Sequence, residues 1–203
     1  MLGPVITEQM RERKAAVVER RRRGEAYCGS ENGGKTWIVE GYNTGAKSYF
    51  YLDDLKRYGS SLEVARCSHA SVTLPNKINH LNATNLHGCT IRINKGLISG
   101  VELTRVSTSR VFLSGVSVCQ VDLCDKVDFF FPNAEEARKC KIVHANNVDI
   151  RIFVEEMGFE LPTSLFSGDQ QISFFSPETG SFQNVLSAKV KESGYLDLNA
   201  LDR

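Results

Sequence analysis

The chain has 203 residues, of which 41% are apolar and 24% are charged, and its formal net charge is +1. This size and composition are typical of one soluble domain with appendages, and the nearly neutral charge argues against a nucleic-acid partner. Because no stretch approaches the roughly 18 consecutive apolar residues of a membrane helix, we also expect no membrane span.

The first part of the chain, residues 1–34, is predicted to be a basic extension that is partly helical or disordered. A helix is expected over Thr7–Arg23, ended by Gly24, but its apolar stripe is thin. The GSENGG segment, Gly29–Gly34, is typical of a linker, so ordered structure should begin near Lys35. The opening residues lack the apolar core of a signal peptide, which indicates a cytoplasmic protein.

Residues 35–160 repeat an apolar pattern with a period close to 20 residues. Five segments open with an apolar residue that is followed two positions later by another apolar, a small or an imidazole side chain, and their first positions are 19, 20, 20 and 21 residues apart. Alternation with period two indicates strands with one buried face, and a short fixed period without helices indicates one unit stacked on itself. The five segments begin at Leu62, Leu81, Val101, Val121 and Ile142.

Each of these segments is followed by a second alternating stretch. Leucine-rich repeats have a similar period but need a helical segment and a recurrent asparagine, neither of which recurs here. We therefore predict an all-β fold, a parallel β-helix domain of about six coils. The side chains of the second stretches that should point inward are Val72, Leu74, Ile91, Ile93, Val111, Leu113, Val127, Phe129, Phe131, Val148, Ile150 and Ile152.

Residues 161–203 are predicted to form a C-terminal β-hairpin and tail. Gln171–Phe175 and Ser181–Val190 have strand character and flank a turn-like segment, Ser176–Gly180. The end of a β-helix exposes unpaired strand edges, which need to be covered. The hairpin should therefore either fold back on its own column or exchange with a second copy. We expect a homodimer formed by this exchange. The expected dimer contacts are Ile172, Phe174, Phe175, Val185, Leu186 and Val190.

The six cysteines are interpreted as free thiols of a reducing compartment. A structural zinc site needs ligand pairs two to four residues apart, whereas the nearest two cysteines, Cys119 and Cys124, are five apart. Free cysteine packs as a small apolar side chain, so we expect core positions and neither a metal nor a cofactor. The six are Cys28, Cys67, Cys89, Cys119, Cys124 and Cys140.

Four segments resemble one family, in the same order along the chain. Gly34–Glu40 (GKTWIVE) and Lys77–Leu81 (KINHL) come first, and Ser114–Val118 (SGVSV) and Cys140–Ala145 (CKIVHA) follow. Together they resemble the C-terminal domain of the cyclase-associated proteins over about residues 34–160. The chain has none of the helical domain, proline-rich tracts or upstream actin-binding helix of the larger members, so it resembles a short form with the β-helix only.

This resemblance implies a right-handed parallel β-helix that dimerises by exchanging C-terminal strands. It also implies binding of monomeric actin (G-actin), support of actin nucleotide exchange, monomer recycling and filament turnover, and association with the cytoskeleton. Such a regulator is not an enzyme and needs no cofactor.

Two other functions fit a β-helix. A carbohydrate-active enzyme would need a carboxylate cluster, for which Asp122, Asp125 and Asp128 are the candidates, but corner aspartates commonly serve turns. The tubulin cofactor C family shares the fold and uses the arginine of a Gln-x-Arg triplet to stimulate GTP hydrolysis. The similar triplet here is Gln120-Val121-Asp122, which reverses the charge. A cofactor-C-like GTPase-activating or adaptor protein is the alternative.

The residues between the inward positions should form an outward surface. Two of them are phenylalanines, Phe112 and Phe130, and arginines flank them, a mixture that is favoured at interfaces. The tail or the N-terminal extension could equally cover them. The outward column also holds Asp128 and Asp149. The expected partner-binding residues are Lys77, Arg92, Lys95, Arg105, Arg110, Phe112, Phe130 and Arg151.

Overall fold

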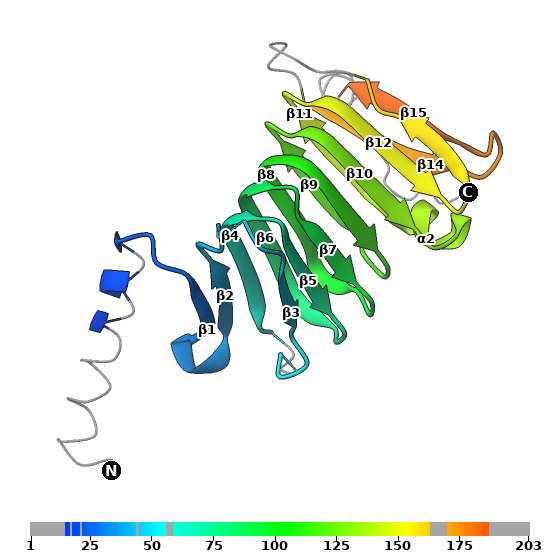
Figure 1. The fold of residues 1–203 in the computed structure, drawn as a ribbon. Coiled ribbons are helices and arrows are strands. Elements are labelled where there is room, and N and C mark those ends of the chain that lie inside the picture. Colours follow the sequence, from blue (N-terminus) through cyan, green and yellow to red (C-terminus); the bar gives the residue numbers. More distant parts are fainter. Residues whose placement is uncertain are drawn as a thin grey trace.

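The structure is a computed structural model that describes residues 15, 16, 18–20, 22–43, 45–55, 59–162 and 170–186. Its strands lie side by side in a column that follows the chain from one end of the molecule to the other (Figure 1). Fifteen strands belong to one continuous sheet that coils around an apolar core. The predicted all-β parallel β-helix is therefore confirmed.

Two stacks of parallel strands, which we call the first and second faces, make up the column. The first face contains β2 (Thr36–Glu40), β4 (Ser61–Ser68), β6 (Ile78–His87), β8 (Leu97–Leu113), β9 (Val118–Asp122) and β11 (Lys141–Ala145). The second face contains β3 (Ser48–Tyr51), β5 (Ala70–Leu74), β7 (Thr90–Ile93), the later part of β8, β10 (Asp125–Phe131) and β12 (Val148–Val154).

The column makes about five turns, slightly fewer than the six coils that the repeats predicted. At its C-terminal end the chain leaves β12 and reverses into β13 (Met157–Glu160). Because β13 runs antiparallel to β12, it closes the column there and does not begin another turn.

The stacked positions follow the predicted repeat with one correction. Leu81 pairs with Leu62 and Val101, as the spacing predicted. In the next layer, however, Val101 pairs with Cys119, and Val121 pairs with Leu103. A shift of two residues leaves the same side chains on the buried face, so alternation alone could not detect it.

The corners between the two faces contain pairs of residues with positive φ, three positions apart. In the corner between β4 and β5 these are Arg66 (φ 51°) and His69 (φ 56°), and the intervening Cys67 is buried. A left-handed backbone conformation costs free energy for most residue types. Burial of the side chain between the two left-handed residues offsets this conformational cost. The same pair recurs at Asn85 and Gly88, Arg105 and Thr108, Leu123 and Lys126, and Asn146 and Asp149.

The core consists of apolar side chains stacked layer upon layer. All the predicted inward residues of the second stretches are buried except Val148, which is half-buried. Its neighbour Asn147 enters the core instead, where its Oδ1 accepts from the Cys124 N–H (2.8 Å) and its Nδ2 donates to the Val121 carbonyl (2.9 Å). Five of the six cysteines are buried, as predicted, and Cys28 is exposed.

The N-terminal end differs from the prediction. β1 (Tyr27–Glu31) pairs antiparallel with β2, and a 3₁₀ turn, η1 (Asn32–Gly34), joins them, with Gly33 at φ 67°. The GSENGG segment is therefore part of a hairpin that covers the edge of β2, and it is not a linker. Residues 15, 16, 18–20 and 22 are helical, and the rest of the helix expected over 7–23 lies outside the described residues.

A short helix, α2 (Ala134–Lys139), lies between β10 and β11 and was not predicted. Its start nevertheless has a cap signal in the sequence, because the Oδ1 of Asn133 accepts from the Glu136 N–H (2.9 Å). The Glu136 carboxylate accepts in turn from the Gly115 N–H, which fixes the helix to the turn before β9. No helix in the described parts of the chain is long and apolar enough to cross a membrane.

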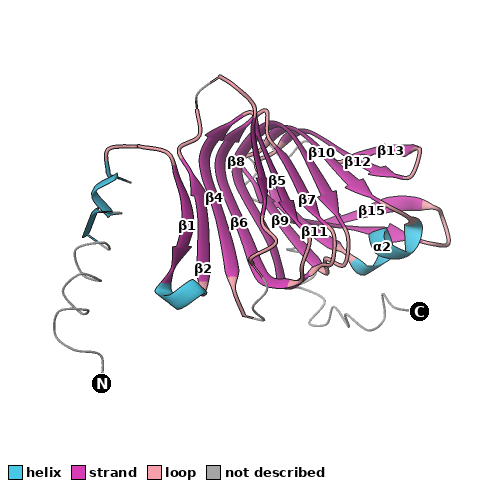
Figure 2. Cartoon of the chain, turned by 60° about the horizontal axis from the view of Figure 1, so that its bottom comes forward, coloured by secondary structure: helices cyan, strands magenta, loops and turns pink. Residues whose placement is uncertain are grey.

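At the C-terminal end, β14 (Gln171–Ser176) and β15 (Ser181–Leu186) form the predicted hairpin, and β14 pairs antiparallel with β11 of the same chain. β13, β15 and α2 gather at this end of the column (Figure 2). Four phenylalanine rings meet there, with centroids 5.5–6.3 Å apart. They are Phe131, Phe159, Phe175 and Phe182.

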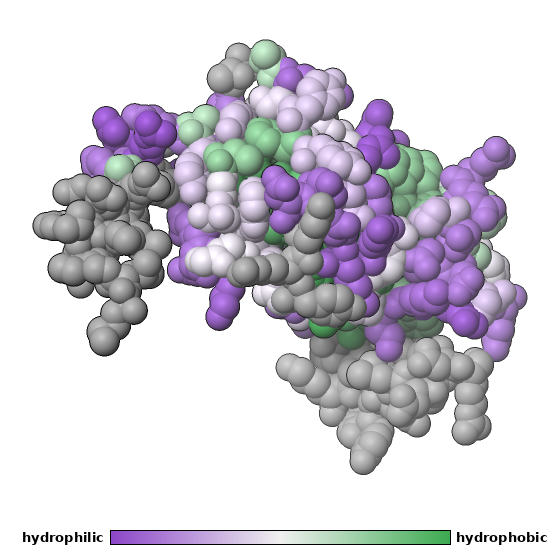
Figure 3. All heavy atoms as spheres, turned by 90° about the horizontal axis from the view of Figure 1, so that it is seen from below, coloured by the Kyte–Doolittle hydropathy of each residue, from purple (hydrophilic) through white to green (hydrophobic). Residues whose placement is uncertain are grey.

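The surface seen from below in Figure 3 is mainly polar, and apolar residues gather in smaller patches between the polar ones. The apolar side chains that the coils enclose form one core cluster, as expected for a stacked column.

Candidate partner-binding face

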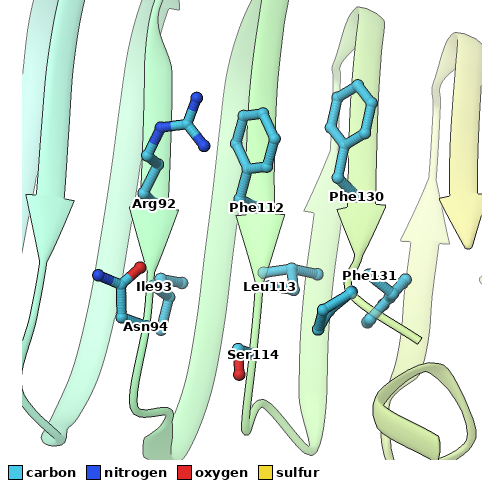
Figure 4. A pocket seen from close by; sticks show the side chains of 9 residues that line it. Arg92, Ile93, Asn94, Phe112, Leu113, Ser114, Phe130 and Phe131 are labelled. Carbon is cyan, nitrogen blue, oxygen red and sulfur yellow. The ribbon is translucent and has the colours of Figure 1, made fainter. Parts of the chain in front are cut away.

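The outward side of the second face carries a row of one arginine and three phenylalanines. The parallel register places Arg92 beside Phe112, Phe112 beside Phe130, and Phe130 beside Phe153. Figure 4 shows Arg92, Phe112 and Phe130 projecting from neighbouring strands toward the same side. The side chains of one residue in each layer thus form a continuous line across β7, β8, β10 and β12.

The rings of this row are stacked. The Phe112 and Phe130 centroids are 4.6 Å apart with 13° between the planes, and those of Phe130 and Phe153 are 4.9 Å apart with 12°. The Arg92 guanidinium lies over Phe112, 3.7 Å from the ring centroid. Cation–π contacts of this kind stabilise by about 0.5–1 kcal/mol at exposed sites. Each ring is half-buried, so the row is held in place while one side of it contacts solvent.

A second row of charged residues lies next to the rings. Arg110, Asp128 and Arg151 occupy neighbouring layers in register. Arg151 donates to both carboxylate oxygens of Asp128, from Nε to Oδ1 (2.8 Å) and from Nη2 to Oδ2 (3.1 Å). Bidentate geometry makes this one of the stronger types of surface ion pair, and it orients Arg151 near Phe153, with 5.7 Å between the guanidinium and the ring centroid.

A hollow of about 340 Å³ opens at the end of the row, where the strands turn toward the first face. Apolar and polar side chains both line it, with Arg92, Phe112 and Phe130 on one side and Asn94 and Ser114 toward the strand ends (Figure 4). A hollow with an apolar wall and a cationic edge suits an apolar side chain flanked by a carboxylate. The residues that line it include Arg92, Asn94, Phe112, Ser114, Phe130 and Pro132.

The charge of this surface is positive. Within the described part of the chain, neither Arg92 nor Arg110 forms an ion pair, and both are exposed. Asp128 is paired with Arg151, so its charge is already compensated. We call the whole surface the ladder face, and it comprises Arg92, Arg110, Phe112, Asp128, Phe130, Arg151 and Phe153.

A family model described as adenylate cyclase associated (CAP) C terminal matches residues 28–162, which is more than half of the chain. The chain belongs to this family. The match extends from β1 to the end of β13, so the hairpin of β14 and β15 lies beyond it.

A solved structure with the same fold is the crystal structure of a cyclase-associated protein from Cryptosporidium parvum. The TM-score is 0.61 at 15% sequence identity, and the alignment covers 80% of this chain and 95% of that one. At this identity the likeness shows the fold alone. Comparison with curated proteins finds no match.

The structure brings together five of the eight expected partner-binding residues of this CAP C-terminal chain: Arg92, Arg110, Phe112, Phe130 and Arg151. The other three lie elsewhere and are exposed. Lys77 and Lys95 are in the turns that lead from the second face to the first, and Arg105 is at the corner on the other side of β8.

Sequence reasoning missed Phe153, the third ring of the ladder. The signal was available, because Phe153 continues the outward alternation of Asp149 and Arg151 along β12. Gly158 of β13 lies against this ring, since a Cβ built there would be 3.3 Å from Cε1 of Phe153. β13 therefore closes the row at its C-terminal end, while the described residues leave Arg92 and Phe112 uncovered.

The expected dimer contacts divide between the two sides of the hairpin. Phe175 is buried in the ring cluster at the end of the column, whereas Ile172, Phe174 and Val185 are half-buried on the outer side. Leu186 is the last residue of β15. Val190 lies outside the described residues.

The three aspartates considered for catalysis do not share one surface. Asp122 ends β9 on the first face and accepts from Nδ2 of Asn146 (3.1 Å), whereas Asp128 pairs with Arg151 on the second. Asp125 begins β10 at the corner between them. Asp122 therefore serves its corner, as the turn interpretation predicted. Among the described residues, no three His, Cys, Asp or Glu side chains are grouped to hold a metal.

Proposed function

We propose that this chain is a non-enzymatic regulator that binds monomeric actin through the ladder face. Membership of the CAP C-terminal family supports this role. The observation that carries it is the exposed row of stacked phenylalanine rings with Arg92 and Arg110 beside it. In this proposal, binding promotes nucleotide exchange on actin and recycling of monomers during filament turnover, in the cytoplasm and with the cytoskeleton.

The ladder face has the properties of an energetic centre of an interface. Aromatic and arginine side chains dominate such centres, and aromatic rings bury a large area while losing little rotamer freedom. Stacking already holds Phe112 and Phe130 in one orientation, and Phe112 supports the Arg92 guanidinium. Less entropy is then lost on binding. The unpaired positive charges favour an acidic partner surface and would accelerate its association.

We further propose that the chain acts as a homodimer that exchanges the hairpin of β14 and β15. Among the described strands of the column, β14 pairs with β11 alone, over the four pairs from Lys141 to His144. The ten residues from 161 to 170 connect it to β13. A ten-residue connection spans up to about 33 Å when extended, and we expect this length to let the hairpin pair with β11 of a second copy. Exchange would pair two actin-binding faces in one symmetric particle.

Sedimentation velocity of the purified chain with monomeric actin tests the binding proposal. We expect a complex with the wild type and a much weaker one with Arg92→Glu/Arg110→Glu. The matched control is Arg105→Glu, which places a similar charge change at a corner away from the ladder face. Release of a fluorescent ATP analogue from actin should follow the same order.

If the wild type forms no complex, the proposed function is wrong. If Arg105→Glu weakens the complex as much per charge as the double variant does, binding depends on overall charge, and the ladder face is not the site.

A further inference from the structure

The hairpin of β14 and β15 meets the last layer of the column through a polar cluster that is buried on β11 and β14 and reaches the surface at Asn184 of β15. His144 of β11 is only 1% exposed and Ser173 of β14 is fully buried. The His144 Nε2 lies 2.9 Å from the Ser173 Oγ and 3.3 Å from the Asn184 Oδ1 of β15. Gln171, beside His144 in the β11–β14 register, completes this group, which we call the His144 cluster.

The hydrogen bonds of the cluster determine the protonation state of the ring. The Ser173 hydroxyl donates to Asn184 Oδ1 (2.9 Å), and Asn184 Nδ2 donates to Gln171 Oε1 (2.7 Å). The Ser173 oxygen is therefore left as an acceptor, so the His144 Nε2 must carry the hydrogen. His144 Nδ1 then carries no hydrogen, and it is buried without a hydrogen-bond partner among the residues that the structure describes. The closed hairpin thus holds a neutral imidazole.

The position of His144 in the column does not require a polar side chain. The same position in the preceding layers is occupied by apolar residues, and in the register of the first face these stack directly on one another. They are Val39, Val64, Ala83, Leu103 and Val121. Only the layer that contacts the hairpin contains an ionisable group there.

We propose that protonation of His144 releases the C-terminal hairpin from its own column, and that acidification thereby frees β11 and the hairpin for exchange with a second copy. The second half of this statement rests on the proposed strand exchange. A second proton would have to occupy Nδ1, where it would introduce a buried positive charge and an N–H without an acceptor. Opening the hairpin exposes the ring to water and removes both costs.

Among the described residues, no charged group pairs with the His144 ring, and on α2, which packs on β14, Glu135 and Glu136 pair with Lys139. β9 contributes Val121 and β14 contributes Gln171 in register, and β15 contributes Asn184. The ionisable groups on these strands face elsewhere: Asp122 bonds to Asn146 at the corner, and Lys141 lies on the outer side beside Phe174. In the core, Cys119 and Cys140 are neutral because burial raises their thiol pKa values, that of Cys140 to about 12.

The direction of the pH effect follows from linkage. Burial lowers the pKa of His144 below its ordinary value of 6.5, and the hydrogen bond with Asn184 opposes this only in part. The open hairpin therefore binds more protons than the closed one, and acid favours opening. The closed state is fully stable above pH 6.5 and weakens as the pH falls below it. The opening equilibrium therefore rises between about pH 7.5 and about pH 5.5, and the limit for a ring that stays neutral when closed is about tenfold.

Amide hydrogen exchange of the full chain at these two pH values tests the release. After correction for intrinsic exchange rates, protection of β14 and β15 should fall at the lower pH, by up to about tenfold, while the protection of β6 and β8 stays unchanged. His144→Gln should remove the pH dependence of amide protection in β14 and β15. The matched control is His69→Gln/His80→Gln/His87→Gln, which leaves His144 as the single histidine of the chain and should behave as the wild type.

Three results would overturn the proposal: a hairpin whose protection does not change with pH, a pH response that survives in His144→Gln, or an equal loss of protection in β6 and β8. If His144→Gln fails to close its hairpin, the triple variant still decides, because its pH response can come only from His144 among the histidines.

Subunit exchange separates this proposal from the dimer proposal on which its second half rests. Two populations labelled at Cys28 with donor and acceptor dyes should mix faster at the lower pH. A chain that sediments as a monomer at all concentrations but opens its hairpin in acid refutes strand exchange and retains the release. A dimer that mixes at a pH-independent rate refutes the link between release and exchange.

Discussion

Replacing Phe130 with alanine removes the middle ring of the ladder, which contacts a stacked ring on each side, at 4.6 and 4.9 Å. Each aromatic pair contributes about 0.5–1.5 kcal/mol beyond area burial. The ring is only half-buried, so the cost stays below the 3–5 kcal/mol typical of a buried phenylalanine. We expect the free energy of unfolding to fall by about 2–3 kcal/mol.

Urea unfolding, followed by circular dichroism, measures this change. The matched control is Phe153→Ala, because Phe153 stacks on one ring only and should therefore lose about half as much. A cycle of Phe112→Ala and Phe130→Ala isolates the stacking contribution, and we expect a coupling of about 1 kcal/mol.

The same variant should also weaken actin binding by about 2 kcal/mol, or roughly 30-fold in Kd, since truncation of an interface centre typically costs that much. Sedimentation at a temperature where both proteins remain folded measures it. If Phe130→Ala unfolds at the wild-type urea concentration and binds actin with the wild-type Kd, the ladder contributes neither to stability nor to recognition, and our reasoning about this face is refuted.

Three further predictions concern the core and the hairpin. Native alkylation at about pH 8 should label Cys28 alone, because the other five thiols are buried. At Cys140, for example, a pKa of about 12 leaves roughly one thiol in ten thousand as the reactive thiolate. Rapid labelling of more than one cysteine, detected by mass spectrometry, would contradict this prediction. Phe175→Asp should release the hairpin, so that the chain sediments as monomer or aggregate. Phe174→Asp lies on the outer side of the hairpin and should change the sedimentation less. Equal changes in the two variants would contradict the orientation of the hairpin. Asn147→Ala removes the hydrogen bonds that the Asn147 side chain makes to the Cys124 N–H and the Val121 carbonyl. The Tm should therefore fall by about 4–8 °C in calorimetry. An unchanged Tm would show that water replaces both bonds.

Local pattern was sufficient for the architecture of the column. The repeat near 20 residues and the alternation within each repeat predicted a parallel β-helix. Val72, Ile91, Val111 and Phe129 are buried and pair in register from layer to layer, which confirms the predicted inward side. Both signals are local, because the direction of a side chain in a strand depends only on whether its position is odd or even.

Alternation also predicted most of the ladder face. Once Val111 and Phe129 point inward, Phe112 and Phe130 must point outward, and the structure places them there. The sequence could not show that their rings stack, because stacking requires that the two strands align without an offset. A slip of two residues would have kept both rings outward and separated them.

Only the tertiary structure decided the features that join distant segments. Val121 slips by two residues relative to the predicted repeat, the GSENGG segment becomes a hairpin on β2, and Phe175 rather than Phe174 faces the ring cluster. The pairing of His144 with Ser173 joins residues 29 positions apart. In each case the alternatives present the same local pattern, and the energy that separates them comes from contacts between strands, which no short stretch of sequence contains.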